Sequence, residues 1–173
     1  MKEGIVWAVV VSVEDADSKP DAAPGNQHSA AQGHAAAAHE TATAARYDAR
    51  MTETFNAVAE VLQLYFDGLH HSDTQRLRRV FHAAALYACA SDGSLLSLGM
   101  DAYFTRVDQR PSPASKGEPR ADRILRIEFV GPVTALAVVE CSIAPKRFTD
   151  LLTLVLLDGR WQIISKVFHY VVD

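Results

Sequence analysis

Two runs of residues near the end of the chain constrain its fold more than any other feature. Arg147–Leu157 reads RFTDLLTLVLL and Arg160–Tyr170 reads RWQIISKVFHY, with Asp158-Gly159 between them. A type I′ turn needs positive φ at both central residues, and Asp-Gly is one of the pairs that accept this conformation. The pattern predicts a long β-hairpin that the rest of the chain covers or extends.

The size and charge of the chain limit the classes of function that it can have. It has 173 residues, enough for one domain and a tail. A composition of 49% hydrophobic and 22% charged residues is typical of a globular protein. The net charge is -4 with no basic block, so no nucleic-acid partner is expected. No run approaches the ~20 apolar residues of a membrane helix, so no membrane partner is expected either.

Cysteine usage favours a reducing compartment. Cys89 and Cys141 lie far apart and outside any C-x-x-C pair, so we expect two core thiols in a cytoplasmic protein, without a metal or another cofactor. Gly4–Val13 has the length of a signal-peptide core. However, Glu3 cancels the charge of Lys2 and no small-residue cleavage site follows, so this alternative is disfavoured.

Residues 1–50 differ in composition from the rest of the chain. They include an acidic, proline-containing stretch and an alanine-rich one, with almost no aliphatic side chain to bury after residue 13. Such a segment is expected to be a disordered or poorly ordered extension. His28, His34 and His39 lack the spacing of a metal-binding tract, so a solvated linker is the preferred interpretation. Met51 then opens a domain predicted to cover residues 51–173.

Apolar periodicity predicts the elements of this domain. Residues 53–70 and a segment that starts at Ser72 have helical spacing, and Gln75 stands at the capping-box distance from Ser72. Short strands at 85–90 and 94–98 and a brief helix at 101–107 follow. Four longer strands complete the chain, at 122–130, 133–143, 147–157 and 160–170. Helices segregated from antiparallel strands indicate an α+β fold, with the helices packed on one face of a curved sheet.

Three stretches carry a resemblance to a known superfamily. They are VLQLYFDGLHHSDTQRLRRVFH at 61–82, LLSL at 95–98 and FTDLLTLVLLDGRWQIISKVFHY at 148–170. Residues 52–170 resemble the nuclear transport factor 2-like superfamily, in its SnoaL-like and "putative lumazine-binding" branch. The superfamily's usual F-H-P-D-A reads Phe81-His82-Ala83-Ala84-Ala85 here.

The resemblance implies a cone-shaped mixed sheet, as in cystatin-like folds, with three helices on its concave face. It also implies a deep cavity for a small-molecule ligand and, often, a homodimer. The same fold hosts isomerases, dehydratases, cyclases, hydrolases and pure binding proteins, so it does not define the chemistry.

Expected turn lengths give a cross-strand register. A two-residue turn at Asp158-Gly159 places Asp150 opposite Val167 and diagonal to His169. Loops of three residues at 144–146 and of two at 131–132 place Glu140 opposite Asp150, and Arg123 opposite Glu140. The interior face is then expected to carry a polar row of Arg123, Glu140, Asp150 and His169, with Ser165, Leu125, Ile127, Phe129, Leu136 and Val138 on the same face.

Such a row has two interpretations, acid–base chemistry and a structural ion network. Two facing carboxylates on an apolar wall cannot both be ionised cheaply, so one becomes an acid while a neighbouring Arg or His holds the other charged. Asp150, Glu140 and His169 are therefore the candidate catalytic residues. A buried ion network that closes the open end of the cone explains the same pattern without catalysis.

Other side chains are candidates for lining the ligand cavity: Arg123, Ser165, His82, Tyr65, Tyr87, Phe104 and Trp161. The aromatic ones, with Tyr103, serve core packing or stacking on a flat ligand. His82 faces the cavity rim or bonds nearby backbone. The sequence therefore leaves two functions open. One is binding of a small, flat, partly apolar molecule. The other is an acid–base enzyme of the isomerase, dehydratase or cyclase type.

The outer face of the predicted sheet suggests assembly. It would carry Thr149, Thr153, Val155, Ile164 and Phe168, flanked by Arg126 and Lys166. A face of this composition favours a twofold contact of sheet on sheet between two copies of the chain.

Overall fold

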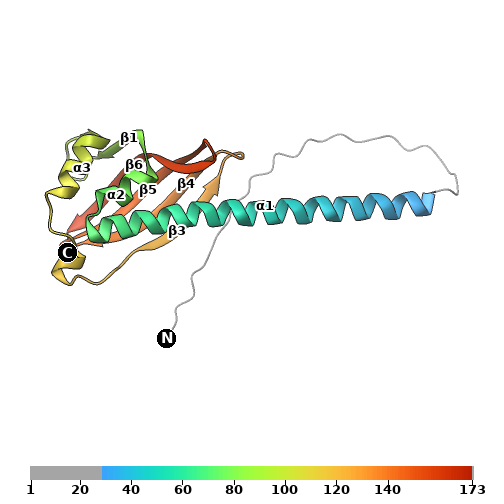
Figure 1. Ribbon diagram of the computed structural model, residues 1–173, viewed down its shortest axis with the longest axis horizontal. Helices are drawn as coiled ribbons and strands as arrows, with labels where there is room; N and C mark the ends of the chain where they lie inside the picture. Colours follow the sequence, from blue (N-terminus) through green and yellow to red (C-terminus); the bar gives the residue numbers. More distant parts are fainter. Residues whose placement is uncertain (1–28, 173) are drawn as a thin grey trace. The chain divides into compact units, whose positions relative to one another are not determined.

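The computed structural model describes residues 29–172, and side chains from residue 42 onward. Its elements follow the order α1 (Ser29–His71), α2 (Thr74–Val80), β1 (Phe81–Cys89), β2 (Leu96–Gly99), α3 (Met100–Asp108), a short 3-10 helix (Ala114–Lys116), β3 (Arg123–Phe129), β4 (Thr134–Ile143), β5 (Lys146–Leu157) and β6 (Arg160–Val172) (Figure 1). Apart from the 3-10 helix, this succession of helices and strands matches the one predicted, and it confirms the α+β class.

One mixed sheet of six strands organises the domain. Its strand order is β2-β1-β6-β5-β4-β3, and every neighbouring pair is antiparallel except β1 and β6, which run parallel. The β5–β6 hairpin lies at its centre. Asp158 and Gly159 both have positive φ, 51° and 72°, as the expected turn requires. The central hairpin is therefore confirmed.

Helix α1 begins at Ser29 instead of near residue 53 as expected. Alanine has the highest helix propensity of all residues, so the alanine-rich stretch extends the helix without needing an apolar face to bury. Residues 42–50 are exposed. Within the described residues, one compact unit ends at Asn56 and a second begins at Ala57. The candidate signal segment Gly4–Val13 and His28 lie outside the described residues.

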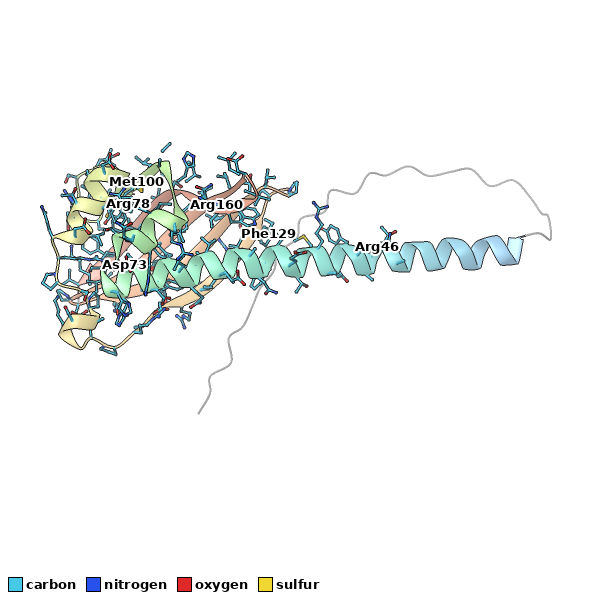
Figure 2. The ribbon with its side chains drawn as sticks, viewed as in Figure 1. Arg46, Asp73, Arg78, Met100, Phe129 and Arg160 are labelled. Carbon is cyan, nitrogen blue, oxygen red and sulfur yellow. The ribbon has the colours of Figure 1, made fainter. Side chains whose placement is uncertain are left out.

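The second helix is capped differently from the prediction. Asp73, not Ser72, is the N-cap residue of α2, and its Oδ1 accepts a hydrogen bond from the backbone N–H of Arg76 at 3.0 Å (Figure 2). Ser72 has φ 49° and lies at the bend between the helices. Gly68 allows this tight corner, because a Cβ there would lie 2.6 Å from Leu77 Cδ2.

The core lies between the helices and one face of the sheet. Val58, Leu62, Tyr65 and Phe66 of α1 are buried, together with Tyr103, Phe104 and Val107 of α3. The sheet contributes alternate residues, among them Ala135, Ala137 and Val139 of β4 and Leu152 and Leu154 of β5. Trp161, expected on the interior of the domain, is 6% exposed. Cys89 and Cys141 are buried and not bonded to each other. Among the helices that the structure describes, none is long and apolar enough to cross a membrane.

Candidate functional site

The predicted interior row of polar residues does not form. Strand β4 turns into β5 through two residues, Ala144 and Pro145, so Ile143 pairs with Lys146, and Val139, not Glu140, pairs with Asp150. A one-residue difference in register moves every side chain of a strand to the opposite face. The inward residues of β4 are therefore Ala135, Ala137, Val139 and Cys141, while Leu136, Val138 and Glu140 lie on the outer face.

A second irregularity changes the face of the sheet to which the side chains at the end of β6 point. Leu154 pairs with Ile163 as expected, but Thr153 pairs with Ser165, so Ile164 is the extra residue of a β-bulge. Beyond the bulge, Asp150 pairs with Phe168 instead of Val167. Ser165 and His169 consequently lie on the outer face, and Lys166 and Phe168, which were expected on the outer face, point into the core.

The pairing of Arg123 with Glu140 holds, although the loop between their strands differs from the expected one. The β3–β4 connection is one residue longer, since Val130 N–H bonds Thr134 O at 2.9 Å. A bulge between Ile124 and Arg126 restores the register further along. Arg123 Nη2 donates to Glu140 Oε2 at 2.7 Å on the outer face. Leu125 is the extra residue of that bulge, and Ile127 is buried as expected.

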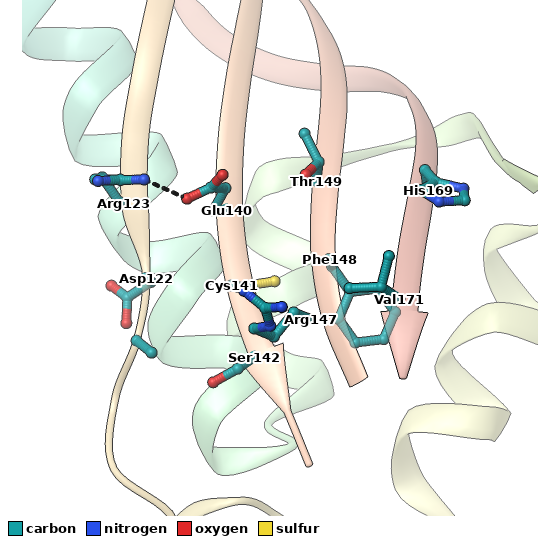
Figure 3. A pocket seen from close by; sticks show the side chains of 11 residues that line it. Asp122, Arg123, Glu140, Cys141, Ser142, Arg147, Phe148, Thr149, His169 and Val171 are labelled. Atoms are coloured by element: carbon teal, nitrogen blue, oxygen red, sulfur yellow. Dashed lines mark hydrogen bonds and ion pairs between the residues drawn. The ribbon is translucent and has the colours of Figure 1, made fainter. Parts of the chain in front are cut away.

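Figure 3 shows the row that does exist, made of Arg123, Glu140, Thr149 and His169 on neighbouring strands, with Thr149 in the place expected for Asp150. These four residues line a pocket of about 400 Å³. His169 Nδ1 lies 2.9 Å from Ser91 Oγ. The structure thus separates Asp150 from Glu140 and His169, the other two catalytic candidates.

Asp150 is nevertheless the centre of a buried polar cluster. Its side chain is fully buried, and Lys166 Nζ lies 2.9 Å from its Oδ2. Tyr65 OH donates to the same Oδ2 at 2.7 Å and accepts a hydrogen bond from Lys166 Nζ at 2.5 Å. Cys141 Sγ is 3.6 Å from Asp150 Oδ2. We call Tyr65, Asp150 and Lys166 the buried triad; it joins α1, β5 and β6.

The charge state of the triad follows from its geometry. Burial alone lowers the pKa of Lys166, but the charge of Asp150, with smaller contributions from Cys141, Tyr87 and the Asp150 hydrogen bond, outweighs burial, so the pKa of Lys166 is raised. Burial raises the pKa of Tyr65 well above its ordinary value, and the Asp150 charge raises it further. The triad therefore holds an ammonium ion and a neutral phenol at physiological pH.

Two buried polar atoms have no hydrogen-bond partner within the described part of the chain. They are Asp150 Oδ1 and the hydroxyl of Tyr103. Burial raises the pKa of Tyr103, a rise that the Arg110 charge opposes and the Asp150 charge reinforces. Buried polar atoms are rarely left unsatisfied, so each of these two atoms calls for a partner such as an ordered water or another polar group.

A pocket opens beside the triad. The mouth pocket, of about 560 Å³, is bounded by β1, the β1–β2 turn, the C-terminal end of α3, the β4–β5 turn, and β5 and β6. Tyr87, Phe148 and Phe168 line it, and Lys166 Nζ lies 5.0 to 5.8 Å from the centres of these three rings. The triad itself does not line the pocket, so one layer of aromatic rings separates the pocket from the Lys166 ammonium.

The remaining candidates lie in different surroundings. Tyr87 is half-buried and stacks on Tyr103 with 4.5 Å between ring centres. Phe104 is buried against Phe81 and Tyr103 and does not line the mouth pocket. Trp161 lines a different pocket, of about 390 Å³, beside α1 and α2.

His82 is engaged locally, since its Nδ1 accepts a hydrogen bond from the backbone N–H of Ala84 at 3.1 Å.

Sequence reasoning missed Lys166 and Cys141, because the bulge and the short turn that direct them inward leave no clear signal in the sequence. Within residues 29–172, no three His, Cys, Asp or Glu side chains are grouped so as to hold a metal ion.

Comparison with solved structures identifies the class of protein. The chain is similar to a nuclear transport factor 2-like protein from Silicibacter pomeroyi, with a TM-score of 0.64 and 26% identity over 70% of this chain and 98% of that one. A nuclear transport factor 2-like protein from Shewanella baltica gives a TM-score of 0.63 and 28% identity over 70% and 97%. Both are described as of unknown function. The fold is thus nuclear transport factor 2-like, a cavity fold that suits ligand binding.

The family follows from the sequence of the same domain. Residues 53–169 match the model of the family described as "Putative lumazine-binding", and the chain belongs to this family. It is also 28% identical over 117 residues to the aldolase FrzH from a Cladobotryum species, a match that covers 66% of this chain and 90% of that protein.

Proposed function

We propose that this protein binds a small, flat, partly apolar molecule in the mouth pocket. The observation that carries the proposal is the aromatic layer of Tyr87, Phe148 and Phe168, with the pocket on one side and the buried triad on the other. Ligand pockets are concave and combine apolar walls with polar groups that fix the ligand's orientation, and a volume of about 560 Å³ is within their usual range. The fold and the family support the proposal.

A thermal-shift screen of flat heteroaromatic compounds on the full chain tests this proposal. Ligands that raise the melting temperature should lose most of this effect in Tyr87→Ala, because Tyr87 is a half-buried ring of the aromatic layer that lines the pocket. Trp161→Phe changes an aromatic side chain in the other pocket and serves as the matched control. Ligands that stabilise wild type and Tyr87→Ala equally would place binding elsewhere.

A second candidate is an acid–base enzyme that acts on a carbonyl compound. It is favoured by the free Asp150 Oδ1 beside a charged Lys166, and by the similarity to a protein named an aldolase. In this mechanism Asp150 Oδ1 takes the α-proton of the carbonyl compound, and the electron pair of the C–H bond passes to the oxygen. A Lys166 N–H stabilises the resulting enolate, and the aromatic layer must open to admit the compound.

Hydrogen–deuterium exchange separates this candidate from pure binding. Catalysed exchange of the α-protons of propionaldehyde or acetone, followed by NMR in D₂O, should fall by about 10²–10⁴ in Asp150→Asn, the usual effect of losing a positioned proton-transfer group. Asp158→Asn, at the exposed hairpin turn, should exchange at the wild-type rate. Equal exchange in all three proteins would leave binding as the function.

We also propose that two copies associate through the outer face of the sheet. Leu86, Leu151 and Val167 lie on this face and are 44%, 44% and 45% exposed. Val167 pairs directly with Leu151, so the exposed apolar side chains are contiguous. Apolar sheet faces of this kind commonly mark contacts between subunits.

The two free thiols support a cytoplasmic location for the protein.

A further inference from the structure

We propose that the ligand of the mouth pocket carries a negative charge, as a flat aromatic carboxylic acid does, and that Arg110 binds its anionic group. This inference rests on the proposed binding function. It adds a class of ligand and a specificity-determining residue to that function.

The cations that line the mouth pocket have no ion-pair partner among the described residues. Arg106 of α3, Arg110 after α3 and Lys146 at the start of β5 all line it. None of them forms an ion pair with a carboxylate in the part of the chain that the structure describes. Most other cations of the domain are ion-paired: Arg76, Arg78, Lys116, Arg120, Arg123, Arg126 and Lys166.

The acidic side chain in the lining leaves this positive charge largely in place. Asp92 lines the pocket, and its Oδ1 already accepts a hydrogen bond from Tyr170 OH. Lys146 Nζ lies 3.6 Å from the centre of the Tyr170 ring, so its contact there is with an aromatic face. Three cations against one anion make the pocket positive, although the whole chain has a net charge of -4.

Arg110 is held in position to bind an anion. Its Nε donates to Ser72 Oγ at 3.1 Å and its Nη2 donates to Leu69 O at 3.2 Å, at the end of α1. These bonds fix the plane of the guanidinium, while its Nη1 has no hydrogen-bond partner among the described residues. A half-buried guanidinium with a free N–H is a preorganised donor for a carboxylate.

The rest of the pocket suits the apolar part of such an acid. Tyr87, Phe148 and Phe168 give it aromatic walls, and the hydroxyl of the buried Tyr103, on which Tyr87 stacks, has no hydrogen-bond partner in the part of the chain that the structure describes. A flat ring can lie against these walls while its carboxylate faces Arg110, Arg106 and Lys146. An inorganic anion would contact only the cations of the lining, and a neutral flat molecule would contact only its aromatic walls.

A matched pair of probes tests the inference by NMR titration of the full chain. 2-Naphthoate should bind about tenfold or more tightly than 2-naphthamide, because a charge-assisted hydrogen bond adds to the same ring contacts. Added salt should weaken naphthoate binding alone. Arg110→Gln should remove most of the difference between naphthoate and amide affinity without changing amide affinity.

Control variants keep this test decisive. Arg79→Gln removes an exposed arginine that lines the pocket beside Trp161, and it should leave both affinities unchanged. If Arg110→Gln unfolds, Lys146→Gln and Arg106→Gln should each weaken naphthoate binding and leave amide binding intact. Equal affinities for acid and amide would overturn the charge inference and leave the binding proposal standing. If neither probe binds, both are overturned.

Discussion

Lys166 Nζ lies 2.9 Å from Asp150 Oδ2, and both side chains are almost completely buried between the sheet and the helices. Asp150 pairs with Phe168 and Lys166 pairs with Leu152, so the two charged residues are diagonal neighbours on the inner face. Removing two charges from water is costly, and Tyr65 offsets part of this cost by bonding to both of them.

Breaking the ion pair from one side should destabilise the domain strongly. Lys166→Met or Asp150→Asn leaves an unpaired buried charge, so each should lower the free energy of unfolding by about 3–5 kcal/mol. The double variant removes both charges and should cost less than the sum of the two. Urea denaturation of all four proteins gives the coupling energy, and a loss below about 1 kcal/mol in each single variant would contradict the buried pair.

Trp161→Ala should destabilise the domain by about 3–5 kcal/mol, since it truncates a large buried aromatic side chain. The ring contacts Phe129, with 6.0 Å between ring centres, so the cavity would open next to β3. Leu157→Ala, on the same hairpin but 45% exposed, is the control and should cost much less. A small loss for Trp161→Ala in denaturant unfolding would mean that the hairpin faces are reversed.

The triad should make stability depend on pH in the alkaline range. The native pKa values of Tyr65 and Lys166 are raised above their ordinary values of 10.0 and 10.5, so the native state holds these protons more tightly than the unfolded state does. Their contribution is fully present below about pH 10 and is lost as pH rises through the native pKa values. The denaturation midpoint of the double variant Tyr65→Phe/Lys166→Met should therefore fall less steeply than that of wild type as the pH rises above about 10. The variant Tyr47→Phe, at an exposed tyrosine, should follow wild type.

Leu151→Lys and Val167→Lys should separate the proposed dimer. Both side chains are exposed on the outer face, so a charge there opposes contact between sheets and leaves the monomer folded. Light scattering at micromolar concentration should give a dimer for wild type and a monomer for the variants. Leu95→Lys changes an exposed residue just before β2 and should remain dimeric. A monomeric wild-type mass would refute the proposal.

Deleting residues 1–50 should leave the thermal stability of the domain nearly unchanged. Within this stretch, residues 42–50 are exposed, and the first residue of α1 that is buried in the core is Val58. The melting temperature of residues 51–173 beside that of the full chain measures the effect. A drop of many degrees would show that the extension is part of the folded domain.

The sequence alone determined the order of the elements and the interior position of particular residues. Leu152, Leu154 and Asp150 alternate on one strand, so the two leucines identify the face on which Asp150 lies. Asp158-Gly159 defined the central hairpin in the same way. Both inferences depend on interactions between near neighbours in the chain, which is why they hold.

Only the tertiary structure decided which residues meet Asp150. The two-residue turn at Ala144-Pro145 places Glu140 on the outer face of the sheet. The bulge at Ile164 places His169 on the outer face and Lys166 on the inner face. Each is a one-residue difference, yet each reverses the facing of a strand because side chains alternate with a period of two. Tyr65 joins the cluster from a helix 85 residues earlier in the chain, and spacing in the sequence does not encode such a contact.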